Sequence, residues 1–106
     1  MASLHKTYTL GFLFRNGKII LAAKKRKIGV GKINGYGGRV EEGEDRTECL
    51  VREIKEECFV VVEKEKCVEL GYIDFHFQDK PDFNQRVYIY RIDEFSGEPS
   101  VTQYMG

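Results

Sequence analysis

The chain has 106 residues, of which 42% are hydrophobic, and its 17 basic and 17 acidic side chains balance to a net charge of zero. This length suits one domain, residues 1–106, and is too short for two. Zero net charge argues against binding nucleic acid through bulk charge, and no apolar segment is long enough to cross a membrane. The three cysteines lack metal-ligand spacing, so we expect reduced thiols in a soluble cytoplasmic protein.

The first predicted elements are two strands joined by a tight turn. Large apolar residues alternate over residues 8–14, as in a half-buried strand, and Asn16-Gly17 favours a hairpin because both positions tolerate positive φ. A second strand should return antiparallel over residues 18–23. Residues 24–38 contain five glycines and are expected to form a loop whose backbone turns sharply or approaches a ligand closely.

Charge is distributed unevenly around this loop. Residues 24–39 carry six basic side chains and no acid, whereas residues 41–57 carry eight acids and three bases. Two solvated faces are the simpler interpretation of such charge runs. Polyphosphate chemistry is the alternative, because it uses cationic side chains and a metal ion side by side.

The next predicted element is a helix that begins at Asp45. Glu48 stands three residues later, at the spacing of a capping box. Residues at helical spacing form one stripe that should face the core: Thr47, Leu50, Val51, Ile54 and Cys58. Glu53, Glu56 and Glu57 lie on the flank beside this stripe, where they would line a groove between the helix and a sheet.

Three further strands are predicted after the helix. Residues 59–63, 67–77 and 85–93 are rich in Val, Ile, Tyr and Phe, which favour strands. Residues 80–82 supply the turn between the last two strands, and residues 97–99 mark another turn. The order of elements predicts an α+β domain with a mixed sheet.

The carboxylates of Glu53, Glu56 and Glu57 have the spacing i, i+3 and i+4, so they share one flank of the helix. Like charges this close repel one another, and a bare helix would gain nothing from the arrangement. A divalent cation would reverse the sign of that energy, and Mg²⁺ prefers oxygen ligands. The spacing therefore predicts a metal site, and a substrate whose negative charge needs the metal.

The same residues carry a resemblance to the Nudix hydrolases. The motif of that family is a glycine, five residues, a glutamate, seven residues, and then Arg-Glu-aliphatic-x-Glu-Glu-x-Gly-aliphatic. The matching positions are Gly38, Glu44, Arg52, Glu53, Ile54, Glu56, Glu57 and Val60. The first strand and residues 24–26 and 34–38 resemble the MutT-type branch, and within it the animal hydrolases of oxidised purine nucleoside triphosphates. The resemblance covers residues 8 to about 99.

This resemblance implies a Nudix fold, in which a mixed sheet packs against the helix of the motif. It also implies that Glu53, Glu56 and Glu57 are metal ligands. One of them would act as a base toward water, and Glu53 is the first candidate for this role. Arg52 would hold Glu44 and Glu53 in position through charge-assisted hydrogen bonds.

Further contacts are implied outside the helix. Gly38 would offer its backbone carbonyl to the metal, and Lys24 would contact phosphate. Thr9, Asn34 and Phe75 align with positions that form the base pocket in the most similar branch. Without the resemblance, Thr9 would be an ordinary strand residue, Asn34 a turn residue and Phe75 a core residue.

Family membership implies hydrolysis of a nucleoside triphosphate to the monophosphate and pyrophosphate, with Mg²⁺ or Mn²⁺ as cofactor and oxidised purine nucleotides as candidate substrates. The alternatives are a nucleotide-binding or regulatory module without turnover and a scaffold with a vestigial motif. The expected partner is a small-molecule nucleotide. Nucleic acid ranks low, because only the basic patch of residues 24–27 would contact it.

Three features depart from the family pattern. Phe59 stands where the family has a glycine with positive φ, a conformation that costs a bulky residue about 1–2 kcal/mol. Nudix domains continue through another strand and a C-terminal helix, for which the chain leaves no room. Either the chain is a truncated or alternative form, or a partner completes the sheet, for which a homo-oligomer is the candidate. Tyr104 stands near the position of a further family glutamate, for which Glu98 is a candidate replacement.

Overall fold

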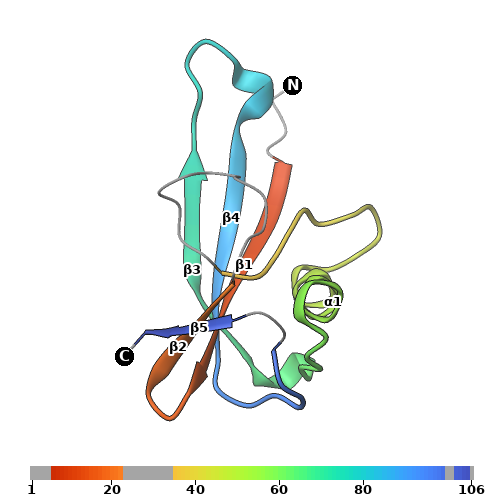
Figure 1. Cartoon of the computed structure of the whole chain (residues 1–106). Coiled ribbons are helices and arrows are strands. Elements are labelled where there is room, and N and C mark those ends of the chain that lie inside the picture. Colours follow the sequence, from red (N-terminus) through yellow and green to blue (C-terminus); the bar gives the residue numbers. More distant parts are fainter. Residues whose placement is uncertain (1–5, 23–34, 100–101, 106) are drawn as a thin grey trace.

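The computed structural model describes residues 6–22, 35–99 and 102–105 (Figure 1). Its elements are β1 (Lys6–Arg15), β2 (Lys18–Ala22), α1 (Arg46–Cys58), the 3₁₀ turn η1 (Lys64–Lys66), β3 (Cys67–Phe75), the 3₁₀ turn η2 (Pro81–Phe83), β4 (Gln85–Ile92) and β5 (Thr102–Met105). The strands form one sheet in the order β3-β4-β1-β2-β5. Among the described strands, only β1 and β4 pair in parallel, so the predicted mixed sheet and α+β class are confirmed.

β1 is the central strand, because it is the third of the five strands in the sheet. One edge lies against β4, and the end of the other edge pairs with β2 through the predicted hairpin at Asn16-Gly17. Further toward the N-terminus, that second edge is bridged by the glycine segment, which we define as residues 35–38, and by Arg39 (Figure 1). The glycine segment therefore runs beside β1 like a short irregular strand.

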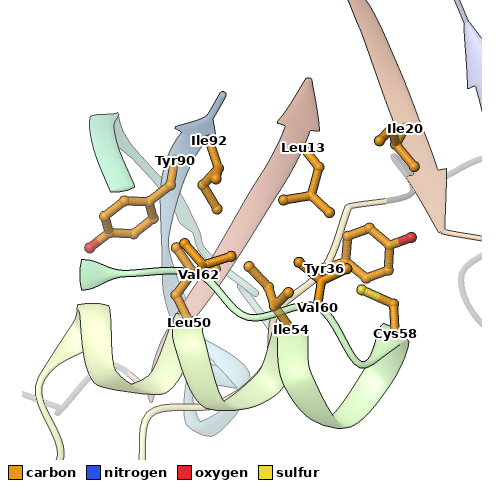
Figure 2. Packing of buried hydrophobic residues seen from close by; sticks show 10 residues of the cluster. All are labelled: Leu13, Ile20, Tyr36, Leu50, Ile54, Cys58, Val60, Val62, Tyr90 and Ile92. Carbon is orange, nitrogen blue, oxygen red and sulfur yellow. The ribbon is translucent and has the colours of Figure 1, made fainter. Parts of the chain in front are cut away.

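α1 packs on one face of the sheet, and the side chains between them form the core (Figure 2). Leu50 and Ile54 point from the helix toward the strands, and both are fully buried. A β carbon on Gly11 would lie 2.8 Å from Leu50 Cδ1, so the close approach of helix and sheet requires glycine there. The remaining buried members of the core are Leu13, Ile20, Tyr36, Cys58, Val60, Val62, Tyr90 and Ile92.

The N-terminus of α1 is capped as its sequence predicts. The backbone N–H of Glu48 donates to Asp45 Oδ1 at 2.7 Å, and the backbone N–H of Asp45 donates to Glu48 Oε1 at 3.0 Å. This reciprocal pair satisfies two backbone donors that the first turn would otherwise leave without partners. The helix therefore begins at Arg46, with Asp45 as its N-cap residue.

The helix α1 ends at Cys58, and its C-cap residue Phe59 has the left-handed conformation, with φ of 65° and ψ of 23°. Its backbone N–H donates to the Lys55 carbonyl at 2.9 Å, so the chain leaves the helix as it would at a glycine. The Phe59 side chain is 72% exposed, and no burial of the ring offsets the backbone strain. Glu57 keeps its place in the last helical turn despite the missing glycine.

Two strand predictions are wrong. Residues 59–63 form no strand but only an isolated bridge between Val61 and Ser96, because this segment crosses the end of the core and buries Val60 and Val62 there. The expectation that the chain leaves no room for another strand is also wrong, because β5 pairs antiparallel with β2. Two strand ends are shorter than predicted: β3 stops at Phe75 and β4 at Ile92. Among the described residues, no helix has the length and apolar character needed to span a membrane.

Candidate active site

Arg52, in the middle of α1, is surrounded by four carboxylates. Its Nε donates to Glu44 Oε2 at 2.7 Å, and its Nη1 donates to Glu53 Oε2 at 2.9 Å. Glu56 and Glu41 lie further away, with closest N···O distances of 3.5 and 3.9 Å. The Glu44 and Glu53 side chains are only 15% and 19% exposed, so these ion pairs are less screened than surface ones. The structure thus contains the predicted contacts of Arg52.

The turn before α1 places Glu44 in this network. Glu44 Oε1 accepts from the backbone N–H of Glu41 at 3.0 Å, and Gly43 supplies the positive φ of the turn. The hydrogen bond from Arg52, followed by that from Glu41, lowers the pKa of Glu44 below its ordinary 4.5. The same bond to Glu44 raises the pKa of Arg52. Both groups are therefore charged at neutral pH.

The glycine segment faces the glutamates of α1 at short range. A β carbon on Gly38 would lie 2.5 Å from the Glu53 carboxylate carbon, so only glycine leaves room for this carboxylate. The backbone N–H of Gly37 donates to Glu57 Oε1 at 3.2 Å, and a β carbon there would collide with the Thr9 carbonyl oxygen. Backbone, and not side chains, therefore forms this wall of the site.

The Gly38 carbonyl oxygen, predicted to bind the metal, is turned toward β1. It accepts from the Thr9 backbone N–H at 2.9 Å, and Thr9 Oγ1 and Cys49 Sγ lie 3.5 and 3.6 Å from it. The backbone N–H of Gly37 donates instead to Glu57, on the side of α1. A metal contact through the Gly38 carbonyl stays a prediction, and this geometry does not favour it.

The three predicted metal ligands share a flank of α1 but are not gathered around one point. Glu53 contacts Arg52, Glu57 contacts the Gly37 N–H, and the Glu56 side chain is 58% exposed. Within the described ranges, no group of three or more His, Cys, Asp and Glu side chains is close enough to hold a metal ion. The charge and oxygen chemistry of the site fit a divalent cation, whereas these rotamers do not form its coordination shell.

Two predicted base-pocket residues, Thr9 and Phe75, lie on opposite faces of the sheet. Thr9 pairs with Tyr88 and faces α1, where it is 3% exposed beside Cys49. Phe75 pairs with Gln85, three residues from Tyr88 along β4, so it belongs to the other face, where it is 44% exposed. The structure therefore separates two residues that the prediction placed in one pocket.

The remaining predicted residues do not join the network of Arg52 in the described structure. Lys24 and Asn34 lie outside the described residues. Both oxygens of Glu98 accept from Arg15 Nη1 at 2.9 Å, which ties this carboxylate to the end of β1. Tyr104 lies in β5, where it pairs with Ile20.

Sequence reasoning missed two parts of the site. Cys49 is fully buried beside Gly38, although the predicted core stripe omitted it. An available signal was its spacing of four residues from Glu53, which puts both on one flank of α1. The second part is an open pocket of about 390 Å³ lined by Arg39, Val40, Glu41, Glu42 and Glu53. No sequence signal pointed to it, because its shape depends on how the loop before α1 folds.

Comparisons with known proteins identify relatives of the chain. The curated oxidized purine nucleoside triphosphate hydrolases of Danio rerio and Mus musculus are 35% and 33% identical to it, over 94% and 97% of this chain. The chain spans 62% and 64% of the lengths of these relatives.

A solved structure and a family pattern complete the comparison. The crystal structure of MutT NUDIX hydrolase from Burkholderia pseudomallei has a TM-score of 0.79 and 23% identity, and the match covers 97% of this chain and 84% of that one. This likeness confirms the predicted fold. The NUDIX domain pattern matches residues 5–103, which is nearly the whole chain. The chain therefore belongs to the Nudix family.

Proposed function

We propose that this chain is a Mg²⁺-dependent nucleoside triphosphate pyrophosphohydrolase, which releases the nucleoside monophosphate and pyrophosphate. The observation that carries the proposal is the cluster of carboxylates around Arg52 beside the glycine segment, because the cluster holds more negative charge than its arginine balances. Family membership supports a hydrolase of diphosphate linkages. The names of the two animal relatives support oxidised purine nucleotides as candidate substrates.

Glu53, Glu56 and Glu57 are the residues that would hold the metal. A bound Mg²⁺ would neutralise charge on the diphosphate and make a bound water more acidic, and Mn²⁺ is a candidate replacement. Glu56 and Glu57 are exposed, so they can change rotamer without repacking the core. Gly38 is the proposed backbone ligand, although its carbonyl oxygen accepts from the Thr9 N–H in this structure.

The remaining roles concern positioning and substrate contact. We assign Glu53 as the candidate base toward water, and Arg52 and Glu44 as the pair that holds it in place. Lys24 is proposed to contact phosphate and Asn34 the base. Phe75 stays a candidate contact for the base on its own face of the sheet.

A nucleotide-binding or regulatory module without turnover is the second candidate function. One observation favours it: within the described part of the chain, the acidic side chains do not form a group that could hold a metal. This candidate predicts nucleotide binding at saturating Mg²⁺ without release of pyrophosphate.

The deciding experiment is pyrophosphate release from a panel of ordinary and oxidised nucleoside triphosphates, with Mg²⁺, with Mn²⁺ and with neither. Metal-dependent release from any nucleotide supports the hydrolase. Glu57→Gln should lower the rate by about 100-fold or more, which is about 2.7 kcal/mol of transition-state stabilisation. Glu63→Gln is the matched control, because Glu63 is exposed and lies outside the network of Arg52.

Equal rates in the wild type and Glu57→Gln would exclude the assigned metal site. No release across the panel, from protein whose circular dichroism shows a folded domain, would leave the binding module as the better candidate. Retained activity in Glu56→Gln and Glu57→Gln together would contradict the hydrolase mechanism proposed above.

The outer edge of the sheet supports a proposal about assembly. β3 is an edge strand, and its Val68, Leu70, Tyr72 and Ile73 side chains are each about half exposed or more. Edge strands of this kind present backbone groups that can pair with another chain, and we propose a homo-oligomer through β3. Light scattering should show a mass above 12.3 kDa that falls in Leu70→Lys. A monomer at all concentrations would contradict this assembly.

We also propose a cytoplasmic location. Cys49, Cys58 and Cys67 are all free thiols, as in most proteins of reducing compartments. Cell fractionation with an antibody against the chain tests this location, and recovery in a secreted fraction would contradict it.

A further inference from the structure

Thr9 and Cys49 form a buried pair beneath the glycine segment. Thr9 comes from β1 and Cys49 from α1, and their Oγ1 and Sγ atoms lie 3.4 Å apart. Thr9 is 3% exposed and Cys49 is not exposed at all. The pair therefore joins the central strand to the helix next to Gly38 of the glycine segment.

Both side chains of the pair converge on one atom, the Gly38 carbonyl oxygen. Thr9 Oγ1 lies 3.5 Å and Cys49 Sγ 3.6 Å from this oxygen, which also accepts from the Thr9 backbone N–H at 2.9 Å. The Thr9 hydroxyl and the Cys49 thiol each carry one hydrogen that can be donated, either to the Gly38 carbonyl oxygen or from one side chain to the other.

The opposite side of Gly38 faces the Glu53 carboxylate, at a distance that leaves no room for a β carbon. A displacement of Gly38 toward α1 would therefore push this carboxylate from its place beside Arg52. The same carbonyl oxygen accepts the backbone bond from Thr9, so the two side-chain contacts add to a position that the backbone ladder already defines in part.

From these contacts we infer that Thr9 and Cys49 are positioning residues, which hold the Gly38 carbonyl and thereby fix where the Glu53 carboxylate rests. Neither side chain touches substrate in this assignment. Thr9 thus acts from beneath the site and not within a base pocket. The kinetic part of the inference rests on the proposed hydrolase function, whereas its structural part does not.

The first test measures amide-hydrogen exchange at residue 9, whose N–H donates to Gly38. Thr9→Val keeps the shape of the side chain and removes the hydroxyl, whereas Thr9→Ser keeps the hydroxyl and removes the methyl group. If positioning depends on the hydroxyl, Thr9→Val should speed exchange at this amide by about 2- to 10-fold, the effect of one net hydrogen bond. Thr9→Ser should stay within about twofold of the wild type. The reverse order would show that Thr9 acts by filling space, and would overturn the inference.

Cys49 is tested with a matched control. Cys49→Ala should also speed exchange at residue 9, and Cys49→Ser should restore protection because it keeps a donor. Cys67→Ala serves as the control, because Cys67 Sγ lies 3.6 Å from the Glu63 carbonyl, the same contact at the same distance but away from Gly38. Equal exchange at residue 9 in Cys49→Ala and Cys67→Ala would exclude a positioning role for Cys49.

The second test measures kcat and KM in the same variants. Thr9→Val and Cys49→Ala should lower kcat by about 2- to 10-fold with little change in KM, because Glu53 is displaced while substrate contacts remain. Thr9→Ser and Cys49→Ser should recover kcat. Wild-type protein without turnover would refute the proposed function, and the exchange results would still decide the inference. Exchange effects with unchanged kcat would show that Gly38 does not position Glu53.

Discussion

Two arginines of the same helix have very different surroundings. Arg46, in the first turn of α1, donates to Glu69 Oε1 at 2.8 Å, and its guanidinium group lies 4.0 Å from the centre of the Tyr88 ring. Arg52, further along, lies near four carboxylates, two of them mostly buried. One positive charge therefore meets one negative charge at Arg46 and four at Arg52.

This difference separates an ion pair that ties the helix to the sheet from a cluster at which we propose a metal site. At Arg46 the charges are balanced, and the Tyr90 hydroxyl completes the contacts by donating to Glu69 at 2.9 Å. Among the described ion pairs, Arg52 faces four carboxylates, and this excess of negative charge is the reason that we propose a cation there. Ion pairs on one helix can thus be assigned to stability or to function by counting the charges around each.

The largest expected effect is on turnover when the charge of Arg52 is removed. Arg52→Met leaves the Glu44 and Glu53 carboxylates facing one another without their shared donor, so Glu53 loses its orientation. We expect kcat/KM to fall about 100-fold, equivalent to about 2.7 kcal/mol. Steady-state kinetics on the preferred nucleotide measures this. Unchanged kcat/KM in Arg52→Met would remove the distinction between the two arginines.

Arg46→Met should instead change stability. Methionine keeps much of the packing of the side chain but loses the bond to Glu69 and the contact with the Tyr88 ring. We expect the free energy of unfolding to fall by about 1 kcal/mol, because this ion pair is partly exposed. Urea unfolding gives the change in stability. A loss of turnover beyond about twofold in Arg46→Met would mean that Arg46 also serves the site.

Phe59→Gly tests whether the backbone strain at the end of α1 affects the glutamates near Arg52 or only the stability of the helix. Glycine relieves the left-handed conformation, and the lost ring is mostly exposed, so the free energy of unfolding should rise by about 1 kcal/mol. Turnover should not change if Glu56 and Glu57 already occupy their functional places. Thermal unfolding and a rate measurement on one sample check both. A stable variant with altered turnover would show that the end of the helix, as well as Arg52, determines the positions of Glu56 and Glu57.

The smallest expected effect concerns acid pH. The bond from Arg46 is the main reason that the pKa of Glu69 is lowered from its ordinary 4.5. A lowered carboxyl pKa contributes stability that is complete above the unfolded pKa and is lost as pH falls through the folded pKa. Below about pH 4.5 the wild type should therefore lose more stability than Arg46→Met, by less than about 1 kcal/mol because the pair is partly exposed. If the free energy of unfolding falls equally with pH in the two proteins, the pair of Arg46 and Glu69 does not contribute to the pH dependence of stability.

The sequence predicted where the helix begins, but it did not predict which face of the sheet the helix packs on. Asp45 and Glu48 determine the start of α1 through local contacts, so a short motif was sufficient. The large residues of β1 alternate on the face away from the helix, whereas α1 packs over Thr9, Gly11 and Leu13. Hydrophobic size alone could not identify this face, because close helix packing selects small residues there.

The candidate site shows the same limit. The motif correctly placed Arg52 with Glu44 and Glu53, because that spacing lies within one helix and the turn before it. It did not reveal the orientation of the Gly38 carbonyl, nor the separation of Thr9 from Phe75, which depend on pairing between distant segments. β5 was missed because its short sequence has no clear alternation and is ordered by pairing with β2.

The parallel pairing of β1 with β4 has a consequence for how the chain folds as it is made. β1 leaves the ribosome long before its partner β4, which begins at Gln85, so the centre of the sheet cannot close until β4 has been synthesised. Until then the apolar stripe of α1 has only the β1–β2 hairpin to cover it. We therefore expect this apolar stripe to stay exposed during synthesis, and folding to be slower than in a domain built from local contacts.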